Sequence, residues 1–184
     1  MIRRAIEADA AAIAALHVRA WQWAFRGLLP DAYLDGLTEQ VARREAMWRR
    51  QLQEGRPDCP VWVAERGDGG GQIVGFCNTA PAASSTDSAS EGTPAAAELY
   101  TIYLDPDAVG TGVGAALMRH GLMDLQARGF HEAVLWVQDT NTRARRFYEK
   151  GGWRVDGAEK TETVWDAPVR QVRYRIALAA RHQQ

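Results

Sequence analysis

A strand that breaks at a proline, passes through a glycine-rich turn and opens a helix is the feature that most restricts how this chain can fold. It lies within 98–117, with Pro106 at the break and Gly110, Gly112 and Gly114 in the turn. Glycine has no Cβ, so the backbone can bend tightly there and a phosphate can approach its N–H groups. The helix that follows adds unpaired N–H donors and the positive end of its dipole. The pattern therefore predicts an anion-binding turn that suits a pyrophosphate.

Two common phosphate-binding motifs fit this turn poorly. The residues 110–114 lack the Lys and Ser/Thr pair of a P-loop, which a magnesium nucleotide site needs. A dinucleotide-binding Rossmann unit places its turn after a first strand, with an acidic residue about 20 residues later. Here more than half of the chain precedes the turn, and Asp139–Asn141, after the next strand, opens another helix. The Rossmann interpretation stays open only as a weaker alternative.

Two segments resemble the GNAT-type N-acetyltransferases, which bind the pyrophosphate of acetyl-CoA on a Gln/Arg-x-x-Gly-x-Gly/Ala turn after the fourth strand. That turn would be 109–114, preceded by the aromatic-aliphatic-x-Pro segment 103–106. The segment 141–153 looks like the family's Asn-x-x-Ala-x-x-Phe-Tyr-x-x-x-Gly-Phe pattern, with Trp153 in the last aromatic position. Val109 departs from the pattern, since the family has Gln or Arg there. The backbone amides would have to do more of the phosphate binding.

Composition indicates one soluble domain spanning 1–184. The chain is long enough to bury a core without disulfides or metal, and 46% of its residues are hydrophobic. A net charge of −1 and a pI near 6.4 lack the basic excess of nucleic-acid-binding proteins. No segment resembles a signal peptide or a membrane span. We therefore expect a cytoplasmic protein with no nucleic-acid partner and no membrane partner.

The cysteines and histidines show no metal-ligand spacing. Cys59 and Cys77 form no CxxC motif, so two reduced thiols are expected. The four histidines are expected to be surface or core residues, with His17 of most interest because the first helix lines the acceptor cleft in relatives. No metal cofactor is expected.

Hydrophobic patterning predicts alternating strands and helices. Asp9 is a candidate N-cap for a first helix that Pro30 ends, and a second helix is expected over 38–52. The strands expected from the pattern are 2–6, 61–65 paired with 72–79 as a hairpin, a fourth from 98, 133–138 and 171–178. In the last strand, Arg173 and Arg175 alternate with apolar residues and should face away from the core. The low-complexity segment 80–97 is expected to be a mobile loop inside the domain, and 179–184 a tail.

The order β-α-α-β-β-β-α-β-α-β-β predicts an α/β (α+β) fold with a mixed, mostly antiparallel central sheet and helices on both faces. This is also the order that the resemblance implies. The resemblance further implies that strands four and five splay apart. The pantetheine arm of acetyl-CoA would then insert between them as an extra strand.

The resemblance assigns three segments to acetyl-CoA. They are Ile102, Tyr103 and Leu104; Val109, Gly110, Thr111, Gly112, Val113, Gly114 and Ala115; and Asn141, Ala144, Phe147 and Tyr148. Asn141 has a second interpretation, because asparagine often caps a helix. Arg143, Arg145 and Arg146 could reach CoA phosphates, although arginines on a helix usually form a solvated face.

Tyr148 and Glu98 are the candidate catalytic residues. Tyr148 matches the family's tyrosine that protonates the departing thiolate, although a Phe-Tyr pair in a helix is equally ordinary core packing. Glu98 starts the fourth strand where relatives often carry a carboxylate that accepts the amine proton through water. A solvated glutamate at a strand end is the alternative.

Acceptor recognition is expected in the first two helices and their connection, where aromatic residues cluster. Trp21, Trp23 and Tyr33 are the candidate substrate-binding residues, together with Glu98. Trp21 and Trp23 cannot both face the core, because residues two apart on a helix point in different directions. One of them is therefore available to line the acceptor pocket or the interface of a homodimer. Asp31, Asp35 and Glu39 could steer a cationic amine, or form ordinary surface acidity.

These observations together predict an acetyl-CoA-dependent N-acetyltransferase that transfers acetyl directly to a primary amine, expected to belong to a small molecule. Two alternatives stay open. The acceptor could be a protein N-terminus or lysine, which needs an open groove for a peptide. The chain could also be an acyl-CoA-binding module without turnover, which the Val109 substitution allows.

Overall fold

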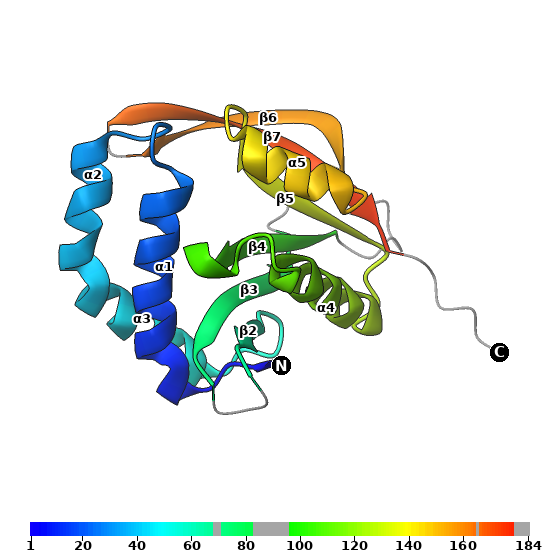
Figure 1. Cartoon of the computed structure of the whole chain (residues 1–184). Helices are drawn as coiled ribbons and strands as arrows, with labels where there is room; N and C mark the ends of the chain where they lie inside the picture. Colours follow the sequence, from blue (N-terminus) through cyan, green and yellow to red (C-terminus); the bar gives the residue numbers. More distant parts are fainter. Residues whose placement is uncertain (68–70, 83–95, 165, 179–184) are drawn as a thin grey trace. The chain divides into compact units, whose positions relative to one another are not determined.

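The computed structural model describes residues 1–67, 71–82, 96–164 and 166–178 and divides the chain into two compact units (Figure 1). The first unit contains Met1–Asn78 and Thr101–His120, and the second contains Thr79–Tyr100 and the chain from Gly121 onward. The strands β3 and β4 and the helix α4 each contribute residues to both units. The chain therefore passes between the units inside regular elements rather than through linkers. That one domain spans 1–184 stays a prediction.

The first unit holds most of the helices. Its elements, in chain order, are β1 (Ile2–Arg4), α1 (Ala10–Ala24), α2 (Asp31–Gly36), α3 (Val41–Glu54), β2 (Val61–Glu65), most of β3 (Ile73–Pro81), the end of β4 (Ala97–Leu104) and the start of α4 (Val113–Ala127). Helix α1 buries Ile13, Leu16 and Ala20, which recur at helical spacing, together with Trp48 of α3 and Phe76 of β3. Burial of each large apolar side chain contributes about 1.5–3 kcal/mol, which fixes α1 on the unit's core.

The second unit continues the sheet. It contains the start of β4, the end of α4, β5 (Glu132–Gln138), α5 (Thr142–Lys150), β6 (Arg154–Val164) and β7 (Ala167–Ala177). The seven strands have the order β1-β2-β3-β4-β5-β7-β6. Strand β4 runs parallel to β5, with Ala97 beside Ala133 and Glu98 beside Val134, whereas β5 pairs with β7 antiparallel along its whole length. The expected mixed, mostly antiparallel α/β fold is confirmed.

Several boundaries differ from the sequence prediction. Helix α1 ends at Ala24 with Phe25 as its C-cap, and Pro30 instead precedes the short helix α2, which was not expected. Ala80 and Pro81 belong to β3 rather than to the expected loop 80–97, because the strand continues past the hairpin. Ala97 likewise belongs to β4, and residues 83–95 of that loop and the tail 179–184 lie outside the described residues.

The strand β7 also corrects an expectation about its polar side. Arg173 is only 9% exposed rather than solvated, because it faces Trp136 across the β5–β7 pair and donates to Asp156 of β6 at 2.7 Å. The guanidinium lies over the Trp136 ring, 5.7 Å from its centroid. Side chains of the adjacent strands β5 and β6 therefore bury Arg173. The alternation of residues within β7 alone could not predict this.

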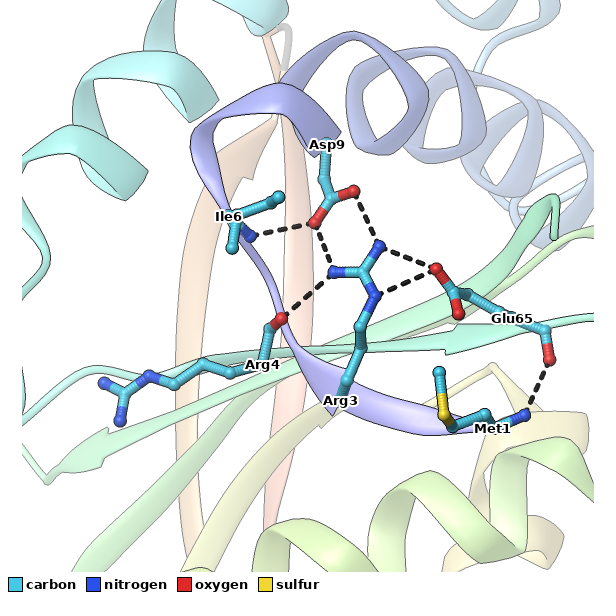
Figure 2. Close-up of polar contacts among 6 residues, drawn as sticks. All are labelled: Met1, Arg3, Arg4, Ile6, Asp9 and Glu65. Atoms are coloured by element: carbon cyan, nitrogen blue, oxygen red, sulfur yellow. Dashed lines mark hydrogen bonds and ion pairs between the residues drawn. The ribbon is translucent and has the colours of Figure 1, made fainter. Parts of the chain in front are cut away.

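Figure 2 shows how Arg3 of β1 ties the first strand to two carboxylates. Its guanidinium donates to both oxygens of Asp9, at 2.7 and 2.9 Å, and twice to Oε1 of Glu65, at 2.9 and 2.7 Å. The Arg4 carbonyl accepts a further bond at 3.1 Å, so every N–H of the guanidinium is used. The Asp9 carboxylate also accepts the Ile6 backbone N–H at 2.8 Å. Asp9 does occupy the N-cap position of α1, but its side chain makes no cap bond there.

Candidate functional site

The glycine-rich turn of the first unit has the backbone shape expected of an anion site. Gly110 and Gly112 have φ of +82° and +88°, a region that L side chains rarely adopt, so glycine is needed at both positions. A Cβ added to either glycine would meet nothing within 4 Å. Helix α4 begins at Val113, so the first N–H groups of the helix lack acceptors inside it and lie next to this open space. The turn can therefore present backbone donors to a phosphate.

Side chains around the turn add little charge. The backbone of Val109 is extended and the residue is 39% exposed, and its side chain supplies no hydrogen-bond donor. The Thr111 hydroxyl donates to the Ala108 carbonyl at 2.6 Å, which braces the turn. Phosphate binding here would depend on the backbone amides and the dipole of α4.

The end of β4 that precedes the turn packs tightly on β3. A Cβ at Gly75 of β3 would lie 2.6 Å from the Leu104 side chain, 2.9 Å from that of Leu117 and 3.3 Å from the Tyr103 carbonyl. Only glycine permits this close approach, so Gly75 sets the position of the predicted pantetheine segment Ile102, Tyr103 and Leu104 relative to β3.

An aromatic cluster surrounds His17 in the first unit. The imidazole stacks on the Tyr103 ring with ring centroids 5.1 Å apart, and its centroid is 5.9 Å from those of Trp21 and Trp48. Trp48 Nε1 donates a hydrogen bond to His17 Nδ1 at 3.4 Å. Burial, with a smaller contribution from the charge of Arg44, lowers the pKa of His17 to about 3. His17 is therefore an uncharged residue of the core, too weakly basic to accept a proton from an amine.

The candidate acceptor residues divide between this cluster and the surface. Trp21 packs on Tyr33, with ring centroids 6.4 Å apart, whereas Trp23 is 39% exposed, as the helical spacing of the two tryptophans predicts. Asp31 and Asp35 both pair with Arg26, at 3.0 and 2.8 Å, so one positive charge offsets half of their negative charge. The pairing weakens their attraction for a cationic amine without removing it.

In the second unit, the helix α5 starts as its sequence predicts. Asn141 is buried, and its side-chain oxygen accepts the Ala144 backbone N–H at 3.1 Å, which confirms the capping interpretation. Arg145 donates to the Tyr174 hydroxyl at 3.0 Å and to the Asp139 carbonyl at 2.9 Å. These bonds hold the Arg145 side chain within the fold, so it is a poor candidate for a CoA phosphate ligand.

Tyr148 lies on α5 among aromatic side chains. Its ring is 5.4 Å from that of Phe147, 6.3 Å from Trp153 and 6.3 Å from Tyr174, and it remains partly exposed. The packing orients the ring, and partial exposure leaves room for the phenol to act on a ligand. Both interpretations of Tyr148 therefore remain compatible with its surroundings.

Glu98 is a half-buried carboxylate on β4, beside Val134 of β5. Burial raises its pKa, and the nearby charges of Lys160 and Arg173 only partly oppose that effect. Within the part of the chain that is described, the carboxylate has no hydrogen-bond or ion-pair partner. A carboxylate whose pKa is raised in this way is a stronger base than an exposed glutamate, which suits it to accepting a proton.

The sequence analysis did not single out two cations near the candidate site residues, Arg44 and Lys160. Arg44 lies four residues before Trp48 on α3, a spacing that places both on one face and was the available signal. The ammonium of Lys160 on β6 lies 4.7 Å from the centroid of the Trp136 ring, which Arg173 also contacts, and no local pattern indicated the contact between Lys160 and Trp136.

The predicted site residues fall into two groups. The pyrophosphate turn, the end of β4, Trp21, Trp23 and Tyr33 belong to the first unit, and Glu98, Asn141, Ala144, Phe147 and Tyr148 belong to the second. Neither Cys59 nor Cys77 forms a disulfide within the described residues. Within the described ranges, no helix is long and apolar enough to cross a bilayer, and no three His, Cys, Asp or Glu side chains cluster as metal ligands.

Comparison with known proteins finds acetyltransferases. A mycothiol acetyltransferase of Acidimicrobium ferrooxidans is 39% identical over 101 residues, which cover 53% of this chain and 29% of that protein. This chain thus spans less than a third of that relative. A "probable N-acetyltransferase" of Mycobacterium tuberculosis is 26% identical over 180 residues, covering 97% of this chain and 94% of that one.

Solved structures share the fold. The PaiA N-acetyltransferase from Thermoplasma acidophilum, solved in complex with coenzyme A, has a TM-score of 0.68 at 18% identity, covering 93% of this chain and 96% of that one. The model of the acetyltransferase (GNAT) family matches residues 14–153, well over half of the sequence. Both motif segments found in the sequence, 103–114 and 141–153, lie within these matched residues. The chain therefore belongs to the GNAT family of acetyltransferases.

Proposed function

We propose that this protein is an acetyl-CoA-dependent N-acetyltransferase that transfers acetyl directly to a primary amine of a small molecule. The observation that carries the proposal is the turn before α4, where two left-handed glycines leave open space beside unpaired helix N–H groups. Membership of the GNAT family supports acetyl-CoA as the cosubstrate. The relatives named mycothiol acetyltransferase support a small-molecule acceptor, because their name refers to one.

The cofactor would bind in parts. The pyrophosphate would accept from the backbone of Gly110–Ala115, and the pantetheine amides would pair with the backbone of Ile102–Leu104 as an added strand. Because the side-chain oxygen of Asn141 already caps α5, its amide nitrogen would be the group that donates to the pantetheine. Ala144 and Phe147 would contribute apolar contacts to the cofactor.

The chemistry requires three proton transfers. An amine attacks the thioester carbonyl only as the free base, so its ammonium form must first lose a proton, and Glu98 would accept it directly or through water. Attack forms a C–N bond and a tetrahedral oxyanion, whose collapse breaks the C–S bond and restores the carbonyl. Tyr148 would donate its phenolic proton to the departing CoA thiolate, and the second proton that the attacking nitrogen must lose to become a neutral amide would restore the phenol.

The proposal is tested by measuring free CoA. The protein is incubated with acetyl-CoA and a panel of primary amines, and the released thiol is measured together with the acetylated amine by mass spectrometry. CoA release that depends on an amine, with matching formation of an acetamide, supports the function. If acetyl-CoA binds by calorimetry and no amine or peptide releases CoA, the chain is an acyl-CoA-binding module instead.

A panel that includes peptides separates the two enzyme hypotheses. Acetylation of peptide N-termini or lysines in preference to small amines would favour the protein-substrate alternative. We also propose a cytoplasmic location and leave a homodimer as a prediction, which sedimentation of the purified protein tests.

A further inference from the structure

Arg44 of α3 is a half-buried cation that the described residues leave without a carboxylate partner. Its Nε is buried and makes no hydrogen bond. Nearby arginines on α1 and α3 behave differently: Arg19 pairs with Asp105 at 2.7 Å and Arg50 with Glu54 at 2.8 Å. Since an unpaired buried N–H of a charged group is costly, the arrangement at Arg44 calls for an acceptor from outside the chain.

The Arg44 guanidinium lies over the ring of Trp21, which is itself part of an aromatic cluster. Its Cζ lies 5.6 Å from the centroid of the Trp21 ring, and Trp21 in turn contacts Phe25 and Tyr33. The charge of Arg44 also acts on both His17 and Tyr103, which places all three side chains in one neighbourhood. Trp21, Phe25, Tyr33 and Tyr103 are only partly buried, so the cluster is not a sealed core.

The neighbours of Arg44 supply no negative charge. Burial raises the pKa of Tyr103 to about 12, so its phenol is neutral at physiological pH. His17 is neutral as well, because its pKa is lowered to about 3. Among the described residues, therefore, no negative charge balances Arg44, and its contact with the Trp21 ring makes attraction to an anion stronger than at a free surface.

Trp21 adds a second donor to this neighbourhood. Its indole Nε1 is buried and has no partner that meets hydrogen-bond geometry. The Tyr103 phenol lies near this N–H, because the indole acts on it as a hydrogen-bond donor and opposes the rise of the Tyr103 pKa, although the pair does not meet hydrogen-bond geometry. An indole N–H and a guanidinium in ring contact can together donate to the oxygens of one carboxylate.

We infer that Arg44 and Trp21 bind the carboxylate of the acceptor, so that the preferred acceptor is a primary amine that also carries a carboxylate. This inference rests on the proposed function, because it names the acceptor class of the same reaction. A guanidinium matches a planar carboxylate through two parallel N–H bonds, which a neutral amide of the same size cannot reproduce.

The test compares amino acids with their own amides as acceptors. An amino acid and its amide also differ in the basicity of their amines, so a single comparison between them is not informative. The informative quantity is the kcat/KM for the amino acid divided by the kcat/KM for its amide. This ratio is compared between the original protein and each variant. Arg44→Met keeps most of the aliphatic stem and removes the charge, and should lower this ratio about tenfold or more, as expected for loss of one charge-assisted hydrogen bond. Trp21→Phe removes only the indole donor and should lower the ratio less.

Two further variants control for folding and for general charge. Arg43→Met changes the exposed neighbouring arginine of α3 and should leave the ratio within about twofold of the original protein, since a surface charge contributes little. Arg44→Lys keeps the charge and should recover part of the preference. An unchanged ratio in folded Arg44→Met protein, or the same loss in Arg43→Met, would overturn the inference.

Failure of the proposed function gives a different result. If no amine releases CoA, the same site is tested by titrating the intact protein with free amino acids and following tryptophan fluorescence. Saturable quenching that is absent with the amides and lost in Arg44→Met supports a carboxylate site without turnover. The absence of a saturable signal, beside normal acetyl-CoA binding, contradicts the site itself.

Discussion

Replacing Arg3 by methionine should destabilise this protein more than any nearby surface change. The substitution keeps most of the apolar stem but removes the guanidinium that joins β1 to Asp9 and Glu65 (Figure 2). The two carboxylate side chains are 9% and 3% exposed, whereas that of Arg3 is 30% exposed. The variant therefore leaves two nearly buried negative charges without their cation.

The magnitude follows from burial. Removing one partner of a fully buried ion pair costs about 3–5 kcal/mol, and the partial exposure of Arg3 places its loss near the lower end, at about 3 kcal/mol. For a chain of this size, that loss lowers the Tm by roughly 6–12 °C. Urea unfolding followed by circular dichroism measures the free energy of unfolding directly.

A matched control and a pH series sharpen the test. Arg4→Met alters the neighbouring strand residue, whose guanidinium makes only a 3.5 Å contact to a carbonyl and lies over Trp62, and should cost less than about 1 kcal/mol. Burial tends to raise the pKa of Asp9, but the bonds from Arg3 and from the Ile6 N–H outweigh it, and the net pKa is lowered.

Because the folded-state pKa of Asp9 is lowered, its contribution to stability is present above the unfolded value of about 3.9 and is lost as the pH falls through the lowered pKa. The difference in stability between the original protein and Arg3→Met should therefore narrow below about pH 4. A cost for Arg3→Met no larger than that for Arg4→Met, or one independent of pH down to acid unfolding, would refute this reasoning.

Four further changes test the site. Gly112→Asp should weaken acetyl-CoA binding, measured by calorimetry, at least about tenfold while the fold persists. Gly129→Asp is the control for backbone strain, because Gly129 is also a left-handed glycine with open space around it, and it should leave binding unchanged. Tyr148→Phe keeps the ring packing and should lower kcat about a hundredfold, with little change in the KM for acetyl-CoA, if the phenol protonates the thiolate; full kcat with chemistry rate-limiting would assign Tyr148 to the core. Glu98→Gln should remove the acid limb of the kcat/KM profile, and should also stabilise the fold at neutral pH, because a raised carboxyl pKa means that ionisation opposes folding. Gly75→Ala should cost about 1–3 kcal/mol in urea unfolding, since its methyl group would meet Leu104 and Leu117 at under 3 Å.

Local sequence determined much of the fold. The strand-like runs 61–65 and 72–79, separated by the glycine-rich sequence 66–71, predicted the β2–β3 hairpin, and Asn141 caps α5 as its residue type predicts. The left-handed backbone at Gly110 and Gly112 was likewise implied by glycines between a proline and a helix. These features depend on φ/ψ preferences and on hydrogen bonds between residues a few positions apart, which a short window of sequence contains.

The charged side chains show what the sequence could not determine. Asp9 was expected to cap α1 but instead binds Arg3, and Arg3 reaches Glu65 of β2, which is 62 residues away along the chain. Arg173 was expected in solvent and is buried beside Trp136. Each outcome depends on which strand lies next to which, and hydrophobic periodicity does not carry that information.

The electrostatic state of the candidate site was decided in the same way. The sequence placed Glu98 at a strand end and His17 on a helix, but tertiary burial raised the pKa of the carboxyl and lowered that of the imidazole. Arg44 became notable only because no described carboxylate lies against it. Residue type and spacing set which groups can ionise, whereas desolvation and pairing with distant residues set whether they do, and only the folded chain brings those neighbours together.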